Sequence, residues 1–158
     1  MDLILWRHAE AVPGSDTLAD LDRPLTPKGQ RQAKRMGEWL NRVLPESARI
    51  LVSPALRTQA TAEALERRFK TVAGLAPDGT IEHLLTETRW PQARDVTVVV
   101  GHQPTLGLAA AYLMGAAHVT ADNAWRIKKG AIWWIRAKTM APGELVVTTV
   151  AVRTPDLL

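Results

Sequence analysis

The amino-acid sequence predicts an α/β fold with a mainly parallel central sheet, helices on both faces and a C-terminal antiparallel strand pair at one side. Two observations predict this class. Short apolar runs typical of buried strands alternate with segments of helical periodicity over most of the chain. After Gly115 this alternation stops, and two strand-forming segments follow one another. The 158 residues contain no internal repeat or linker, so we expect a single domain over residues 1–158.

The first half of the chain contains two units in which a strand precedes a helix. The apolar run from Leu3 to Trp6 predicts the first strand, and the polar stretch 13–24 predicts a loop. Thr26 before Pro27 is typical of a helix start. The apolar face of that helix is expected to carry Ala33, Met36, Leu40 and Val43.

The later elements are predicted in the same way. Segment 48–54 predicts a second strand, and the helix over 55–69 is expected to turn Leu56, Ala60, Ala64 and Leu65 inward. A weaker strand over 71–77 and a helix over 80–90 follow. The valine-rich run 95–104 predicts a strand buried on both faces, and the helix over 105–115 is apolar nearly all round. Strands over 131–138 and 144–152 are expected to form a hairpin across residues 141–143.

Composition narrows the classes of function. The chain has no cysteine, which excludes disulfides, thiolate metal ligands and cysteine-based phosphatase or protease chemistry. No apolar run reaches the roughly 18 residues of a membrane helix, and the N-terminus lacks the basic lead of a signal peptide, so we expect a cytoplasmic protein that does not enter a membrane. The net charge of +4 favours anionic ligands, either nucleic acid or small phosphorylated molecules.

Polar residues follow three of the predicted strands at the point where each strand ends. Arg7 and His8 follow the first, Ser53 follows the second with Arg57 four residues later, and His102 follows the valine-rich strand. Because ligands of open α/β sheets bind beyond the carboxyl ends of the strands, we expect these side chains to form one site. Two guanidinium groups can clamp a phosphoryl group, a neutral imidazole can attack phosphorus, and a second, protonated histidine can donate to a phosphoryl oxygen.

Other residues are interpreted as structural. His83 in a predicted helix and His118 in a predicted loop are expected to be structural or solvated, and the Asp20 to Asp22 stretch is interpreted as a chance likeness to a paired-aspartate phosphatase motif. Without clustered carboxylates and histidines, we expect no metal site and no cofactor. The basic residues of the first predicted helix are interpreted as a solvated face, and no nucleic-acid-reading motif is present.

Four motifs in order, WRHAEA, DRPLTPKG, SPALRTQAT and VVVGHQP, resemble the histidine phosphatase superfamily, whose members include phosphoglycerate mutase, and specifically its small SixA-like phosphohistidine phosphatases. The resemblance implies that His8 is the phosphorylated nucleophile, that Arg7 and Arg57 bind the phosphoryl group and that His102 completes the pocket. Ala9 stands where the family motif usually has glycine, which adds one methyl group near the anion.

The second departure from the family concerns the acid that protonates a leaving group. Relatives that cleave phosphate esters supply a glutamate after the third strand, where this chain offers only Glu82 or Glu87. An alkoxide needs that proton, whereas the imidazole of phosphohistidine leaves more readily. The resemblance therefore implies a metal-independent phosphatase acting on phosphohistidine in a partner protein. The small size of the chain and its few insertions favour a monomer.

Two alternatives stay open at this point. One is a phosphatase of small phosphate esters or phosphopeptides that uses Glu82 or Glu87 as its acid, and the other is a non-catalytic phosphoryl-binding module. The first predicts a strong dependence of ester turnover on those carboxylates, whereas the second predicts that no phosphate can be trapped on His8.

Overall fold

A computed structural model describes residues 1–158 and contains one six-stranded sheet with the order β3-β2-β4-β1-β5-β6. The strands are β1 (Asp2–Arg7), β2 (Arg49–Val52), β3 (Lys70–Thr71), β4 (Thr97–Gly101), β5 (Ile132–Ala141) and β6 (Glu144–Arg153). The first four pair in parallel, whereas β5 is antiparallel to β1 and β6 is antiparallel to β5. The predicted fold class is confirmed.

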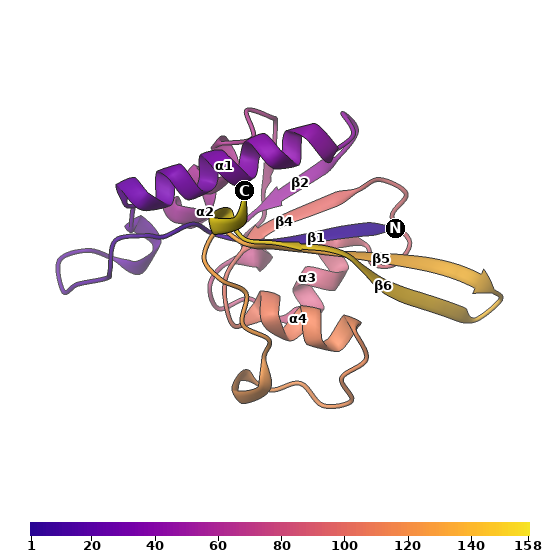
Figure 1. Cartoon of the computed structure of the whole chain (residues 1–158). Helices are drawn as coiled ribbons and strands as arrows, with labels where there is room; N and C mark the ends of the chain where they lie inside the picture. Colours follow the sequence, from indigo (N-terminus) through magenta and orange to yellow (C-terminus); the bar gives the residue numbers. More distant parts are fainter.

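Helices cover both faces of the sheet. They are α1 (Pro27–Val43), α2 (Leu56–Glu63), α3 (Ile81–Thr88) and α4 (Thr105–Leu113), together with four short 3-10 turns, η1 (Asp20–Asp22), η2 (Ala73–Leu75), η3 (Ala121–Asn123) and η4 (Pro155–Leu157). Figure 1 shows α1 and α2 on one side of the sheet and α3 and α4 on the other. None of the four helices has the length and apolarity needed to cross a bilayer.

Alternation along the central strands divides the core into two layers. Leu3 and Leu5 of β1 pack with residues of α3 and α4, whereas Ile4 and Trp6 pack with residues of α1 and α2. All five residues of β4 are buried, as the continuous valine run predicts. Both faces of β1 and β4 are therefore closed to water, and these two strands hold their carboxyl ends in a fixed position.

The start of α1 is fixed by its cap and by close packing. The side chain of Thr26 accepts a hydrogen bond from Gly29 N–H at 3.0 Å. A Cβ at Gly29 would lie 1.9 Å from the carbonyl oxygen of Glu10, so only glycine allows α1 to approach the chain after β1 this closely. Val43, expected on the apolar face, is exposed because it lies in the last turn of the helix, beyond the sheet.

The prediction for α2 is wrong in length and, at Leu56, in its inward face, whereas Leu65 is buried and Ala60 and Ala64 are partly buried as expected. The helix ends at Glu63, and Leu56 is 45% exposed. The buried face instead carries Arg57, Thr58, Thr61 and Ala62. Apolar periodicity misassigns this helix because the side that faces the protein interior is mostly polar.

Tertiary contacts explain where α2 ends. Leu65 leaves the helical path but is buried in the same core layer as α1, and its carbonyl accepts from Asn41 Nδ2 at 2.9 Å. Arg67 donates to Asn41 Oδ1 and to the carbonyl of Pro45, both at 2.7 Å. The segment after α2 is thus tied to the end of α1, and the strand expected over 71–77 is reduced to β3 followed by η2.

The C-terminal hairpin is confirmed and is longer than expected. Strands β5 and β6 have ten residues each and are joined by Pro142 and Gly143, whose φ of +81° favours glycine. The half nearest the turn extends beyond the rest of the sheet (Figure 1), and its residues are exposed.

Candidate active site

The carboxyl ends of β1, β2 and β4 lie side by side in the sheet. Arg7 of β1 is in register with Gly101 of β4, and β4 pairs with β2 on its other side. The N–H of His8 donates to the carbonyl of Gly101 at 3.1 Å, and the N–H of Ser53 donates to that of Val100 at 3.1 Å. The strand ends that the sequence singles out are therefore adjacent.

The two histidines that follow β1 and β4 lie next to one another. The ring centroids of His8 and His102 are 5.4 Å apart, and the ring planes are tilted by 52°. His8 is 6% exposed and His102 is 3% exposed, so each ring is mostly enclosed and touches solvent over a small area. The two rings are close enough to act on the same bound group.

His8 is held in one tautomer. Its Nδ1 lies 2.7 Å from the carbonyl oxygen of Ala9, and because a carbonyl can only accept, Nδ1 carries the proton. Burial, with the nearby charges of Arg57, Arg7 and Arg23, lowers the pKa of His8 to about 4. At pH 7 the ring is neutral, and Nε2 has a free electron pair with which to attack an electrophile.

His102 is held by a serine hydroxyl. Its Nε2 lies 2.7 Å from Ser53 Oγ, which accepts from the N–H of Ala55 at 3.3 Å. The hydroxyl proton can then be donated to Nε2, which leaves the ring proton on Nδ1. Burial and the charge of Arg57 lower the pKa of His102 to about 3, so the ring is neutral, not protonated as the sequence suggested. A phosphoryl anion beside it would raise that pKa.

Both candidate arginines are anchored by backbone carbonyls. Arg7 Nη1 donates to the carbonyl of Ile127 at 2.8 Å. Arg57, in the first turn of α2 and 3% exposed, donates from Nη1 to the carbonyl of Asp20 at 2.7 Å and from Nη2 to Asp20 Oδ2 at 3.1 Å. Burial lowers the pKa of both guanidinium groups below the ordinary value for arginine, but an arginine remains charged in proteins.

Three nitrogen atoms of this cluster have no hydrogen-bond partner. Arg7 Nε, Arg57 Nε and His102 Nδ1 make up half of the six buried side-chain nitrogen and oxygen atoms without a partner in the structure. Buried polar atoms are nearly always paired, and exceptions concentrate at functional sites. Three unpartnered nitrogens among two guanidinium groups and a histidine match a ligand that is anionic and rich in acceptors.

Asp20 is the residue that sequence reasoning missed. It lies in the loop before α1, where the sequence suggested only a chance motif, but its carboxylate binds both Arg57 and Arg23 at 3.0 to 3.1 Å. Partial desolvation raises its pKa, but the hydrogen bond and charge of Arg57 and the charge of Arg23 outweigh this, so that the pKa is lowered and the group is ionised. Its position three residues before Arg23, just ahead of the motif DRPLTPKG, was the available signal.

Thr61 was also missed. Its hydroxyl accepts from the N–H of Ala9 at 3.0 Å and donates to the carbonyl of Arg57 at 2.7 Å. It therefore joins the chain after His8 to the helix that carries Arg57. Ala9 is fully buried, so the methyl group that replaces the family's glycine packs inside the protein. The polar face of α2 was the sequence signal for Thr61.

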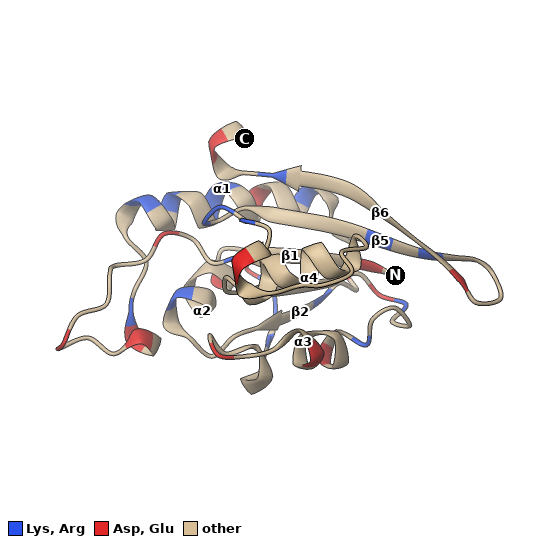
Figure 2. Cartoon of the chain, turned by 90° about the horizontal axis from the view of Figure 1, so that it is seen from below, with Lys and Arg blue, Asp and Glu red and all other residues tan.

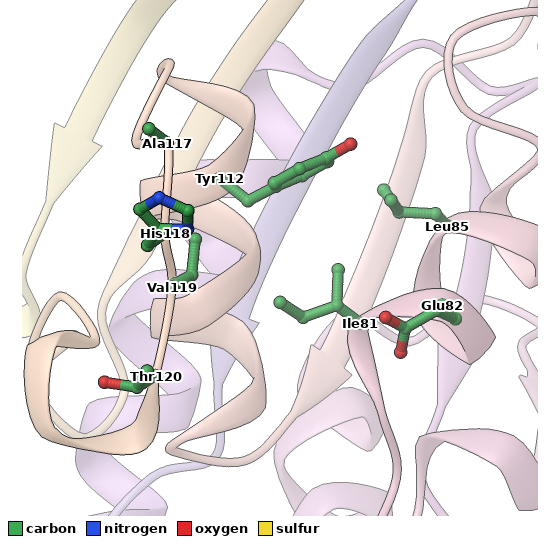
Figure 3. Close-up of a pocket in the computed structure, with 8 residues that line it drawn as sticks. All are labelled: Ile81, Glu82, Leu85, Tyr112, Ala117, His118, Val119 and Thr120. Carbon is green, nitrogen blue, oxygen red and sulfur yellow. The ribbon is translucent and has the colours of Figure 1, made fainter.

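The other histidines and carboxylates lie elsewhere. A groove of about 400 Å³ lies between α3 on one side and α4 with the segment after it on the other. Figure 3 shows its lining, which includes Glu82, Tyr112 and His118. None of the four candidate residues lines this groove. His83 is an exposed residue of α3. The carbonyl of Glu87 accepts from Arg49 at the start of β2, which places Glu87 at the opposite edge of the sheet from His8.

The fold and this polar cluster define a class of protein: an α/β protein that handles phosphoryl groups. The family profile of the histidine phosphatase superfamily, branch 1, matches residues 3–80. An uncharacterized protein of Picosynechococcus sp. is 39% identical over 114 residues, or 68% of this chain and 69% of that protein. The phosphohistidine phosphatase SixA homolog of Haemophilus influenzae is 30% identical over 130 residues, or 73% of this chain and 78% of the relative.

A solved structure shares the whole fold. The protein histidine phosphatase SixA in complex with tungstate superposes with a TM-score of 0.74 over 99% of each chain, at 24% identity. By the family profile and the Haemophilus influenzae relative, the chain belongs to the histidine phosphatase superfamily, and its activity is that of a phosphatase.

Proposed function

We propose that this phosphatase hydrolyses phosphohistidine in a partner protein through a phosphoryl group held covalently on His8. The observation that carries the proposal is the pair of neutral, buried histidine rings 5.4 Å apart, beside two arginines with unpartnered nitrogens. One ring has its electron pair available at Nε2, and the other has a proton to donate from Nδ1. This division of roles suits nucleophilic attack on a phosphoryl group.

In the first step, the electron pair of His8 Nε2 forms a bond to phosphorus while the bond between phosphorus and the substrate imidazole breaks. The electron pair of the broken bond stays on the departing ring, which leaves neutral when its other nitrogen is protonated. His8 becomes a phosphorylated, cationic ring whose Nδ1 proton is held by the carbonyl of Ala9. This hydrogen bond is made to a charged donor in the intermediate and so becomes stronger.

In the second step, the oxygen of a water molecule attacks phosphorus, and the bond to His8 Nε2 breaks. The electron pair returns to His8, both water protons remain with the product as dihydrogen phosphate, and the neutral ring is regenerated. Splitting one hydrolysis into two transfers lowers the barrier of each.

The cations supply the stabilisation of charge. In this proposal the unpartnered Nε atoms of Arg7 and Arg57 donate to the phosphoryl oxygens, as does Nδ1 of His102. These donors are already fixed by Ile127, Asp20 and Ser53, so they need little reorganisation during the reaction.

The carboxylates of the chain favour phosphohistidine over phosphate esters. A catalytic acid needs a raised pKa, but hydrogen bonds from its own backbone N–H and from Thr80 lower the pKa of Glu82, which is fully exposed. Glu87 lies at the opposite edge, and the carboxylate of Asp20 is ionised. An alkoxide would leave unprotonated from this site, whereas a protonated imidazole leaves without an acid. The name of the Haemophilus influenzae relative points to the same substrate.

The organisation as one domain over residues 1–158, the monomeric state, the cytoplasmic location and a role in signalling stay predictions that accompany this proposal. The independence of the reaction from metal ions is also a prediction. It rests on the positive charge that the arginines supply beside His8.

The test is a trapping experiment with a synthetic peptide that carries one phosphohistidine. Brief incubation followed by mass spectrometry should show an acid-labile phosphoryl group on His8, and inorganic phosphate should accumulate. His8→Ala should reduce turnover by at least about 10⁴-fold, as expected for loss of a nucleophile. His83→Ala, which changes an exposed histidine of α3, is the matched control. Full activity in His8→Ala, or binding without hydrolysis by the native protein, would overturn the proposal.

A further inference from the structure

Two groups of exposed cations border the candidate active site. One group lies in the segment before β5 and consists of Arg126, Lys128 and Lys129, and the other lies on α1 and consists of Lys28, Arg31 and Arg35. We call these six residues the basic rim. Figure 2 shows α1 and the segment before β5 carrying blue positions on the same part of the molecule.

The first group is tied to the site residues by hydrogen bonds. Arg126 and Lys128 flank Ile127, whose carbonyl accepts from Arg7. Two residues further on, the N–H of Gly130 donates to the carbonyls of both Arg7 and His8, at 3.2 and 3.0 Å. The three cations therefore lie within a few residues of contacts to the candidate nucleophile and its neighbour.

The helix that carries the second group, α1, contacts the chain just after His8 and the segment before β5. Gln32 Oε1 accepts from the N–H of Glu10, two residues after His8, at 2.9 Å. A Cβ at Gly130, whose φ is +75°, would lie 3.3 Å from Gln32 Cβ and 3.0 Å from Pro155 Cγ. The segment before β5, the start of α1 and η4 are thus packed together. Lys28, Arg31 and Arg35 share one helical face, and with Gln32, Pro155 and Asp156 they line a hollow of about 220 Å³.

Most rim cations have no carboxylate partner. The structure has four ion pairs, and the only rim residue among them is Lys28, at 3.9 Å from Glu10. Arg31, Arg35, Arg126, Lys128 and Lys129 also donate no side-chain hydrogen bond. Asp156 is the one acid that lines the hollow. Positive charge therefore exceeds negative charge in the lining of this hollow, beside the site that we propose to bind a phosphoryl group.

We propose that the basic rim docks an acidic protein surface around the phosphohistidine, so that the preferred substrate is a phosphohistidine flanked by aspartate and glutamate residues. This inference rests on the proposed function. Complementary charge of this kind acts mainly on the rate of association and on the choice of partner. It is also screened by salt, because the cations are exposed.

The experiment compares three substrates: free phosphohistidine, a phosphohistidine peptide with Asp and Glu around the modified residue, and a matched peptide with Asn and Gln in those positions. For the native protein, kcat/KM should be about tenfold or more higher for the acidic peptide than for the neutral one at low salt. Raising the ionic strength from about 0.05 to about 0.5 M should remove most of this difference.

Variants test whether the rim is responsible. Arg31→Glu combined with Lys129→Glu should lower the preference for the acidic peptide by about tenfold or more. Arg42→Glu is the matched control, since it reverses an exposed charge in the last turns of α1, away from His8, and should change the preference less than about twofold. Equal kcat/KM for the two peptides, with normal hydrolysis of free phosphohistidine, would overturn the docking of acidic surfaces by the basic rim. It would leave the proposed function standing.

Two further outcomes are informative. Hydrolysis of none of the three substrates would overturn the proposed function itself. Tight binding of a DNA duplex at about 0.15 M salt that is lost in the Arg31→Glu, Lys129→Glu variant, without any preference between the peptides, would assign the rim to nucleic acid and overturn the docking of an acidic protein.

Discussion

The candidate pocket and the basic rim both carry positive charge at the carboxyl edge of the sheet, but they differ in burial and in anchoring. Arg57 is 3% exposed, and its guanidinium is fixed by two hydrogen bonds to Asp20. Arg31 and Lys129 are exposed and have no partner. Fixed, buried donors can stabilise charge that develops in a reaction, whereas mobile surface charges are screened and mainly guide association.

Replacing Arg57 is the strongest test of this contrast. Arg57→Ala should lower kcat/KM by about 10² to 10³-fold for free phosphohistidine and for peptides alike, because a preorganised donor to the transition state is lost. Arg57→Lys should recover little, since a lysine cannot reproduce the planar fork that binds Asp20 and the substrate together. Steady-state kinetics on both substrate classes would measure this. A loss of kcat/KM confined to the peptides would show that Arg57 acts in docking, as proposed for the basic rim, and not in the reaction.

The pH dependence separates buried from exposed titrating groups. Because the pKa values of His8 and His102 are lowered to about 4 and about 3, neither ring should limit kcat/KM between about pH 8 and about pH 5, where the remaining pH dependence is that of the substrate imidazole, and kcat/KM should fall below about pH 4. In the unfolded chain a histidine has its ordinary pKa of 6.5, so the stabilisation from the two neutral rings is complete above pH 6.5 and is lost as pH falls toward 4.

NMR titration of the ring C–H signals measures these pKa values directly, and urea unfolding at several pH values measures the change in stability. Midpoints of His8 and His102 near the ordinary value of 6.5 would show that the pocket is open to water, and they would contradict the contrast between the buried pocket and the exposed rim.

The smallest effect is expected for Ser53→Ala. Among the four candidate site residues, the Ser53 hydroxyl binds His102 alone, so the variant should lower kcat/KM by about three- to tenfold, in the range of one neutral hydrogen bond. Nitrogen chemical shifts of His102 should change from the Nδ1-protonated form to a mixture of tautomers, which a purely structural role would not produce. Thr58→Ser is the control, because it removes only a buried methyl group, keeps the hydroxyl that donates to the carbonyls of Ser53 and Ala55, and leaves His102 untouched. An unchanged tautomer in Ser53→Ala would contradict the assigned role.

The sequence by itself determined the fold class, because local apolar periodicity predicts the alternation of buried strands and helices. It also placed Arg7, His8 and His102 at strand ends, and the parallel order of β1, β4 and β2 brings such ends together. The hairpin at the C-terminus followed from the same local signals.

Only the tertiary structure decided what depends on contacts between distant segments. It ended α2 at Glu63 through bonds to the end of α1, and it turned Leu56 outward so that Arg57 and Thr61 could face the interior. It also brought Asp20 to Arg57 across 37 residues, and it brought the cations before β5 beside those of α1. Charge and hydrogen-bonding capacity are properties of a residue, but burial and partner are properties of the folded chain, and these set the tautomers and pKa values of the two histidines.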